Sequence, residues 1–315
     1  MAAGQARLIR VVVCACLLLL IDATGALPRA VAGTAGVGRP GTYVLLAAET
    51  ARPVKRIVSL VPALTEMLFA IGAGPNVVGV SNFDSFPPAV KGLPHVGALL
   101  DPDTERILTL RPDLVITYGS QTDAQSRFER AGIRVFTYRH GGIDGVLATM
   151  RELGETVGRT AEANAAARDL QMRLDSIRSR VKGRPRPRTL LVFERMPQTL
   201  RSLYVSGGTG FLNDMLDAAG AVNVFNDVKR ESVQPSQETV LARAPDVIVE
   251  IRAQRLANPD EARRDQAAWN ILASLPAVRQ RRVYFLSGDE LVVPGPRLTM
   301  GVEAMARVLH PDAFR

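Results

Sequence analysis

Cysteine, histidine and tryptophan are scarce in this sequence. Its 315 residues include 2 Cys, 3 His and 1 Trp. Both cysteines, Cys14 and Cys16, lie close to the start of the chain, so the remainder can form no disulfide and offers no thiolate to a metal ion. The histidines, His95, His140 and His310, are far apart in the sequence, which disfavours a structural histidine site. The sequence therefore predicts no resident metal ion and no cofactor.

Signatures of catalysis and of nucleic-acid binding are also missing. No G-x-S-x-G, H-E-x-x-H or G-x-x-x-x-G-K-[ST] segment occurs, so the nucleophile elbow, the zinc-protease pair and the phosphate loop have no counterpart. The net charge is +8, but the arginines are dispersed and aromatic residues make up only 5%. Because nucleic-acid surfaces combine clustered basic residues with exposed rings, we expect no nucleic-acid partner. Because the catalytic motifs are missing, we also expect no catalysis.

No apolar run near the start is long enough for a membrane span. The run over residues 11–21 is shorter than the roughly 20 residues that cross a bilayer. Arg7 and Arg10 precede it, and small residues ending at Ala32 follow, which is the order of a secretory signal. We therefore expect a cleaved signal peptide over residues 1–32, a flexible Gly/Ala-rich leader over 33–54, and a periplasmic location. A lipid anchor at Cys14 is the less favoured alternative, because no small residue directly precedes it.

Strands and helices alternate along the rest of the chain, in two sets. The first set, residues 55–140, has predicted strands at 56–60, 77–80, 113–118 and 133–138 and helices at 63–71, 104–110 and 124–131. The second, residues 188–315, has predicted strands at 188–194, 246–251 and 282–286 and helices at 211–219, 236–243, 267–275 and 297–309. This alternation predicts an α/β fold of two Rossmann-like lobes, each with a mainly parallel sheet.

An internal repeat relates the two sets. Four residues of the first set recur at one constant spacing in the second: Glu105, Leu108, Pro112 and Asp113 correspond to Glu238, Leu241, Pro245 and Asp246. In each copy an apolar strand follows, and the proline ends a helix and favours extended backbone before it. One copy is a common helix-to-strand turn, but two copies in matching order indicate duplicated lobes.

The lobes are separated by residues 141–187, which we interpret as a helical connection. Apolar residues recur at helical spacing over 160–182, with charged residues between them. At about 1.5 Å per residue this helix is about 35 Å long, roughly the diameter of a lobe. An ordinary surface helix has the same pattern, but its position between equivalent lobes favours a connecting spine.

Residues 56–309 resemble the periplasmic binding proteins for cobalamin, haem and iron siderophores. The resemblance rests on matches in order along the chain, at Pro62, Thr65 and Glu66, at Val78, Gly79 and Val80, at both Glu…Pro-Asp segments, and at Gly210, Phe211, Gly220 and Asn223. It implies two lobes joined by one long helix, with a ligand cleft between them. It also implies a monomeric, non-catalytic substrate-binding component of an ABC importer. The cobalamin-binding members of the class resemble the chain most.

The resemblance implies roles for two carboxylates. In cobalamin-binding relatives, one exposed glutamate on each lobe docks into arginine pockets of the two permease subunits, and these positions are Glu105 and Glu238 here. A carboxylate on each lobe can form charge-assisted pairs with a symmetric partner. A carboxylate at a helix start is also favoured by the helix dipole alone, and both effects can operate together.

The resemblance also implies where a ligand is held. The corresponding cleft positions are Pro62, Ala63, Phe83, Leu99, Tyr118, Arg195, Tyr204 and Arg297. Two tryptophans that flank cobalamin in a relative correspond to Leu99 and Ser232, so this chain departs from that relative at two ligand positions. Haem or a ferric siderophore is the alternative, with Arg195 and Arg297 neutralising its anionic groups and Tyr204 or Tyr118 near the metal. We favour cobalamin.

Two functions of other classes remain open at this point. One is an exported α/β hydrolase with a metal cofactor, which needs a nucleophile and base or a ligand cluster within reach. The scarcity of His and Cys argues against it. The other is a scaffold whose lobes bind a protein, which a dry and closed surface between the lobes would favour.

Overall fold

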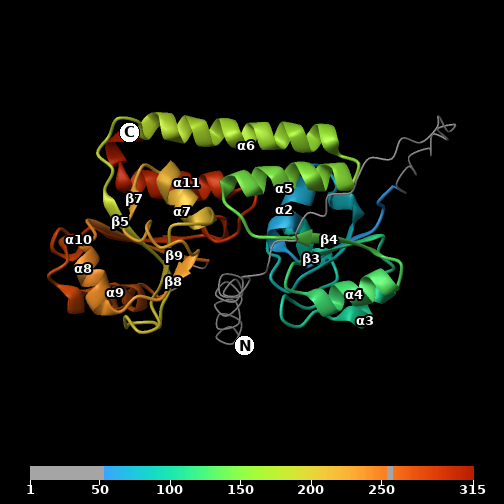
Figure 1. Ribbon diagram of the computed structural model, residues 1–315, viewed down its shortest axis with the longest axis horizontal. Helices are drawn as coiled ribbons and strands as arrows, with labels where there is room; N and C mark the ends of the chain where they lie inside the picture. Colours follow the sequence, from blue (N-terminus) through green and yellow to red (C-terminus); the bar gives the residue numbers. More distant parts are fainter. Residues whose placement is uncertain (1–52, 254–257) are drawn as a thin grey trace, which may run out of the picture.

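The computed structural model describes residues 53–253 and 258–315. The predicted signal peptide and almost all of the predicted leader lie outside the described residues. Within them, two β-sheets lie side by side beneath a long helix (Figure 1). No helix of the described part is both long and apolar enough to span a membrane.

The first sheet is fully parallel and has the order β2-β1-β3-β4. Its strands are β1 (Ile57–Ser59), β2 (Val77–Val80), β3 (Leu114–Tyr118) and β4 (Arg134–Tyr138). Its helices are α2 (Pro62–Ala70), α3 (Thr104–Thr109) and α4 (Thr122–Arg130), with short 3-10 turns at Gly74–Asn76 and Pro88–Gly92. Strands β1 and β3 are almost wholly buried, as expected for a parallel sheet covered on both faces.

The second sheet is mixed. Its strands are β5 (Arg188–Glu194), β6 (Tyr204–Ser206), β7 (Val222–Asn223), β8 (Ser232–Val233), β9 (Val247–Arg252) and β10 (Val283–Ser287). Strand β5 pairs in parallel with β9 and β7, whereas β6 and β8 are antiparallel additions. Its helices are α7 (Phe211–Ala218), α8 (Gln237–Arg243), α9 (Pro259–Ala267), α10 (Pro276–Arg279) and α11 (Leu298–Leu309), with 3-10 turns at Asp289–Leu291 and Pro311–Ala313. The predicted fold class is confirmed.

The internal repeat has a physical basis in the fold. Asp113 Oδ2 accepts a hydrogen bond from Arg56 N at 2.9 Å, and its own N–H donates to Arg56 O at 2.8 Å. Asp246 makes the same two bonds with Arg188, at 3.2 and 2.8 Å. Arg56 also donates to the carbonyl oxygen of Leu110 at the end of α3, and Arg188 donates to that of Arg243, the last residue of α8. The repeated aspartate therefore fixes the start of one strand beside the start of its neighbour, and β2-β1-β3-β4 corresponds to β7-β5-β9-β10.

Two helices connect the lobes. Helix α5 (Ile143–Thr156) is followed by α6 (Thr160–Val181), which runs along one side of the whole molecule (Figure 1). The buried side of α6 carries Ala163, Ala167, Leu170, Leu174 and Ile177 and contacts α5, α7 and α11. These side chains belong to an apolar core that continues from one lobe into the other. The packing of α5, α6, α7 and α11 therefore forms a shared base that joins the two lobes.

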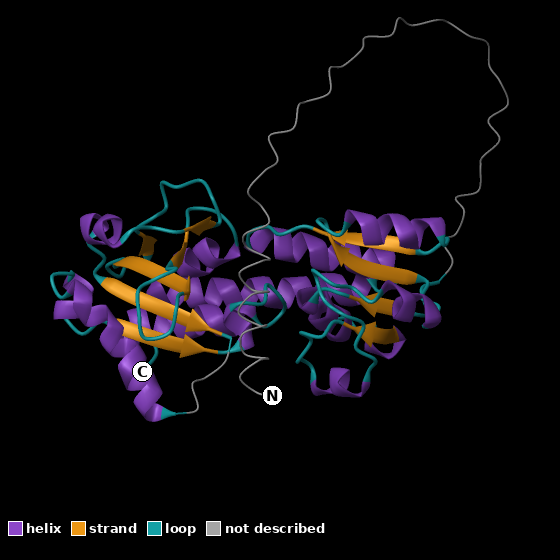
Figure 2. Ribbon diagram, turned by 90° about the horizontal axis from the view of Figure 1, so that it is seen from below, coloured by secondary structure: helices purple, strands orange, loops and turns teal. Residues whose placement is uncertain are grey.

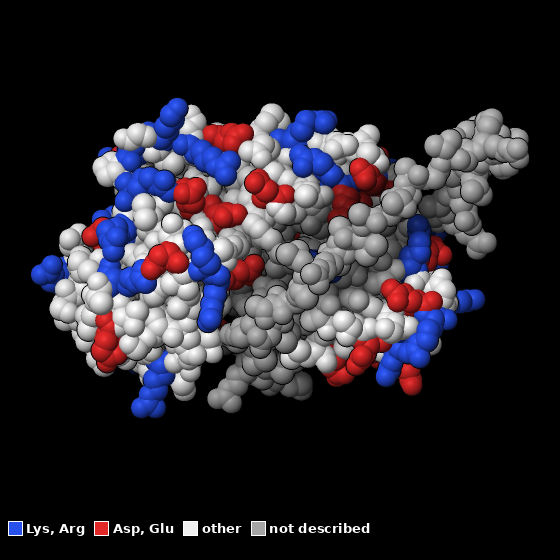
Figure 3. All heavy atoms as spheres, in the orientation of Figure 1, with Lys and Arg blue, Asp and Glu red and all other residues white. Residues whose placement is uncertain are grey.

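The outer side of α6 is charged. Arg173 pairs with Asp169 at 2.8 Å and Arg178 with Asp175 at 3.2 Å, and all four side chains are exposed. Figure 3 shows basic and acidic side chains interspersed along this edge of the molecule. Such exposed pairs typically contribute less than about 1 kcal/mol each, so packing of the inner side holds α6 in place.

One predicted helix is wrong in its bounds. Residues 267–275 were expected to form one helix, but α9 ends at Ala267, a 3-10 turn covers Ala268–Leu272, and α10 begins at Pro276. Leu275 is extended, with φ −62° and ψ 136°, because a residue before proline avoids helical geometry. Helix α5 lies inside the predicted connection over residues 141–187 and buries Ile143, Val146, Leu147 and Met150 at helical spacing.

Candidate functional site

The carboxyl ends of the two sheets point toward each other. Figure 2 shows the arrows of the parallel strands of both sheets directed toward the middle of the molecule. In open α/β sheets, ligands bind beyond the carboxyl ends of the strands. Pro62 and Ala63 follow β1, Phe83 follows β2, and Tyr118 ends β3. In the second lobe Tyr204 pairs with Glu194, the last residue of β5. We call the region between these two edges the interlobe site.

The predicted ligand residues differ in exposure. Pro62, Phe83, Tyr118 and Tyr204 are half-buried, so each keeps some surface that a ligand can contact. Ala63 and Leu99 are 3% and 6% exposed, which places them largely in the packed interior. Tyr204 lies against Phe193, with ring centroids 6.3 Å apart. The first four residues are the stronger candidates.

At the ends of β3 and β4, Tyr138 and His140, which were not predicted as site residues, form an aromatic cluster with the predicted Tyr118. The ring of His140 lies 5.0 Å from Tyr138 and 6.0 Å from Tyr118, and the two tyrosine rings are 6.0 Å apart. The Tyr138 hydroxyl is 3.5 Å from His140 Nδ1, and His140 Nε2 is buried without a hydrogen-bond partner. Burial lowers the pKa of His140 to about 4, so the ring is neutral at pH 7. A neutral imidazole nitrogen is a good ligand for a transition metal.

Sequence reasoning missed His140 because it tested the three histidines only as ligands of one shared metal site. The available signal was position, since His140 comes two residues after Tyr138, the last residue of β4. Parallel neighbours end at the same edge, and Tyr118 is paired with Tyr138. A search of strand ends for metal-binding side chains would have found the cluster.

Arg195 lies inside the second lobe. Its side chain is 1% exposed and pairs with Glu250 at 2.9 Å and Asp265 at 3.1 Å. It also donates to the carbonyl oxygen of Thr199 at 3.0 Å, and Arg252 contacts both carboxylates. A guanidinium whose charge is balanced in the interior is not available to a ligand. This geometry argues against the ligand role predicted for Arg195.

Arg297 is also engaged with carboxylates. Its Nε donates to Glu66 Oε2 at 3.0 Å and its Nη2 to the other carboxylate oxygen at 2.5 Å. Glu290 lies 3.5 Å from Nη1, and the guanidinium carbon is 4.1 Å from the centroid of the Phe86 ring. Glu66 and Phe86 belong to the first lobe. Arg297 therefore bridges the lobes instead of facing solvent with a free charge.

The two predicted docking carboxylates occupy equivalent places. Glu105 and Glu238 lie in the first turns of α3 and α8, are exposed, and form no ion pair within the described residues. A hydrogen bond from Ser236 lowers the pKa of Glu238, so that carboxylate is ionised at neutral pH. Both helices lie far from α6, one on each lobe (Figure 1).

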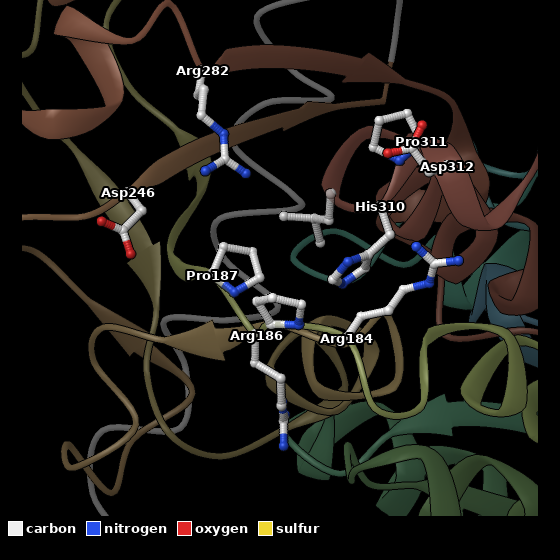
Figure 4. Close-up of a pocket in the computed structure, with 10 residues that line it drawn as sticks. Arg184, Arg186, Pro187, Asp246, Arg282, His310, Pro311 and Asp312 are labelled. Carbon is white, nitrogen blue, oxygen red and sulfur yellow. The ribbon is translucent and has the colours of Figure 1, made fainter.

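A cavity of about 400 Å³ lies elsewhere, at the amino-terminal edge of the second sheet. Arg184, Asp246, Arg282 and His310 are among the residues that line it (Figure 4). None of the predicted site residues lines this cavity. Across residues 53–253 and 258–315, no group of three or more His, Cys, Asp or Glu is placed to hold a metal ion.

Comparison with known proteins gives consistent results. A sequence profile described as periplasmic binding protein matches residues 57–290. An uncharacterised ABC transporter substrate-binding lipoprotein of Bacillus subtilis is 31% identical over 270 residues, covering 83% of this chain and 82% of the relative. The crystal structure of the periplasmic vitamin B12 binding protein of Vibrio cholerae has 25% identity and a TM-score of 0.70, covering 84% of this chain and 99% of that one. A periplasmic heme binding protein of Pseudomonas aeruginosa has 29% identity and a TM-score of 0.70, covering 82% and 93%.

Proposed function

This chain belongs to the periplasmic binding protein family and is a substrate-binding component of an ABC transporter, and we propose that its interlobe site captures cobalamin for import. The observation that carries the proposal is the meeting of two duplicated sheets at their carboxyl ends, each bringing an aromatic residue, Tyr118 and Tyr204, to that region. Half-buried rings there can exclude water from a large planar ligand, while polar groups orient it.

The state of the arginines supports cobalamin over an anionic chelate. Arg195 and Arg297 were the groups expected to neutralise haem propionates or a siderophore, and both are paired with carboxylates of the chain. The rim of a cobalamin ring carries mostly neutral amides, which need hydrogen bonds and apolar contact, not a counter-charge. Relatives named vitamin B12-binding protein, 29% identical over 201 residues, agree with this choice.

A second candidate, haem or a ferric siderophore, is favoured by one specific observation. The cluster of Tyr118, Tyr138 and His140 brings two phenols and a neutral imidazole together at one edge of the interlobe site. Haem iron is held by histidine or tyrosine in several protein classes. Relatives named for heme binding support this alternative.

A titration of the chain without residues 1–32 discriminates between the candidates. The protein is mixed with cyanocobalamin, ferric haem and a panel of ferric siderophores, and binding is followed by calorimetry and absorbance. We expect cyanocobalamin to bind in a 1:1 ratio and the others at least tenfold more weakly. Binding of haem alone overturns the ligand choice but leaves the function, and binding of none contradicts both.

The partner is an ABC permease dimer with its ATPase subunits. We propose that Glu105 and Glu238 dock the loaded protein on this dimer, one carboxylate on each subunit. Their exposure and equivalent positions on two lobes support this role. Long-range attraction between such carboxylates and arginines would also speed association at low ionic strength.

The chain is proposed to act outside the cytoplasm as a monomer, after removal of residues 1–32. The relative described as a lipoprotein supports export and also keeps open a lipid anchor. Cys14 is the candidate for such an anchor, and labelling of cells with a radioactive fatty acid separates the two forms.

A further inference from the structure

A group of side chains beside the interlobe site joins the two lobes. Arg297, directly before α11, holds both carboxylate oxygens of Glu66 on α2. The ring of Phe86 lies under the guanidinium, 4.1 Å from its carbon. Ser85 donates from its hydroxyl to Asp289 Oδ2 at 2.6 Å. In each contact one partner comes from the first lobe and the other from the second.

The central pair of this group is shielded from water. The Glu66 side chain is 4% exposed and that of Arg297 is 18% exposed. A bidentate pair between arginine and carboxylate is directional, and partial burial strengthens its electrostatic attraction. The backbone also approaches closely here, because a Cβ added at Gly295 would lie 3.0 Å from Glu66 Oε2 and 3.6 Å from the carbonyl oxygen of Ala63. The pair therefore lies beside the first turn of α2, which begins at the ligand candidate Pro62.

We propose that Glu66, Ser85, Phe86, Asp289 and Arg297 form a latch between the lobes that sets the width of the interlobe site and opens when a bulky ligand enters or leaves. The link to a ligand rests on the proposed function, whereas the effect on lobe spacing does not. Helices α5, α6, α7 and α11 join the lobes at their base, so the latch adds a second connection near the site. The latch contacts exist only while the lobes are close together, so removing them shifts the population toward a wider spacing of the lobes. Arg297 is then a positioning residue, not a ligand contact.

The charges around Glu66 make the latch sensitive to acid. Burial raises the pKa of Glu66, and two neighbouring carboxylates raise it further, although Arg297 opposes both effects. A raised pKa means that Glu66 gains a proton at a higher pH than an ordinary glutamate, and the protonated form pairs weakly with a guanidinium. The other groups facing this pair are Asp84, Asp289 and Glu290, with His95 beside Asp84.

Distances between spin labels on the two lobes test the latch without any ligand. Labels are attached through Ser126→Cys on α4 and Ala242→Cys on α8, both exposed positions, in the chain without residues 1–32 and hence without Cys14 and Cys16. In this background Arg297→Met is expected to lengthen the mean distance and broaden its distribution. Arg173→Met, which breaks an exposed pair within α6, is the matched control and should change neither.

A second variant guards against misfolding. Arg297→Met leaves a buried carboxylate unpaired, whereas Glu66→Leu combined with Arg297→Met removes both charges and should fold at least as well. Both folded variants should widen the distribution, and acidification should widen it more for the parent than for Glu66→Gln. An unchanged distribution in a folded variant overturns the latch.

Release of cyanocobalamin, followed by stopped flow after dilution into excess competitor, connects the latch to the ligand. We expect at least threefold faster release from the double variant than from the parent. Equal rates together with a widened distance distribution would contradict the role in ligand release. Failure of cyanocobalamin to bind the parent would contradict the proposed function and leave the distance result in force.

Discussion

Arg195 illustrates how far a single residue can be interpreted from sequence. Its predicted ligand role came from its position just after the end of β5, and sequence alone cannot tell whether carboxylates distant in the chain surround it. Glu250 and Asp265 lie 55 and 70 residues away and are both nearly buried. The pairing was therefore visible only after the strands were assembled.

Replacing Arg195 should destabilise the protein strongly. Arg195→Met leaves two buried carboxylates with fewer partners, and removing one member of a buried ion pair typically costs about 3–5 kcal/mol. We expect a loss of about 3 kcal/mol in unfolding free energy, measured by urea denaturation, since Arg252 still contacts both carboxylates. Arg173→Met, at an exposed pair, should cost less than about 1 kcal/mol. Equal losses in the two variants would contradict the structural role.

His140 gives a prediction about pH. Its pKa is about 4 in the folded protein, below the ordinary value of 6.5, so folding favours the neutral ring. The stability that this provides is present above pH 6.5 and is lost as the pH falls toward 4. Between pH 7.5 and 4.5 the parent should lose about 2 kcal/mol more unfolding free energy than His140→Phe. Parallel losses, measured by urea denaturation at each pH, would show that the ring is not buried as described.

At the scale of secondary-structure elements, the sequence pattern and the structure agree best on the bounds of strands. Strand β2 and strand β5 have the predicted bounds, because apolar runs ending at turn residues define them well. The segment 267–275 failed because a proline at 276 starts a new helix and forces its predecessor to be extended. A sequence pattern cannot show a helix cap that is supplied by a residue of the other lobe. The N-terminus of α5 has such a cap.

Asp214 supplies this cap from the second lobe. Gly142, at the start of α5, has no side chain to accept the free helix N–H groups, and Asp214 Oδ2 accepts from Ile143 N at 2.9 Å. Asp214→Ala should therefore lower the unfolding free energy by about 1 kcal/mol, as for the loss of an N-cap. Asp169→Ala on the exposed side of α6 is the control and should lower it by less than half as much. Thermal unfolding of both variants decides between these outcomes.

At the scale of the whole molecule, the docking hypothesis rests on the duplication of the two lobes. The repeated Pro-Asp step was correctly recognised as a helix-to-strand turn, and the structure adds the hydrogen bonds that hold it. Because these bonds fix β3 beside β1 and β9 beside β5, they also fix where α3 and α8 end. Glu105 and Glu238 consequently have equivalent places on two lobes, which the sequence spacing alone could not establish.

Reversing both docking charges should separate binding from transport. Glu105→Lys combined with Glu238→Lys places like charges against the arginines expected on the permease, while the interlobe site is unchanged. Uptake of labelled cobalamin in cells should fall at least tenfold, and calorimetric affinity should stay within twofold. The pair Glu129→Lys and Glu261→Lys, at other sites on the two lobes, controls for the change in net charge. Normal uptake in the docking variant would rule out the assigned carboxylates.

The location of the ligand is the claim on which the whole account depends. Calorimetric titration with cyanocobalamin, comparing the parent with Tyr118→Ala, Tyr204→Ala and Arg282→Ala, tests it most directly. The account predicts that each tyrosine variant binds at least tenfold more weakly, a loss of about 1.4 kcal/mol, because each lobe contributes one face of the interlobe site. Arg282→Ala alters the cavity at the opposite edge of the second sheet and should bind like the parent. Weakened binding in Arg282→Ala alone, with both tyrosine variants unaffected, would contradict the account.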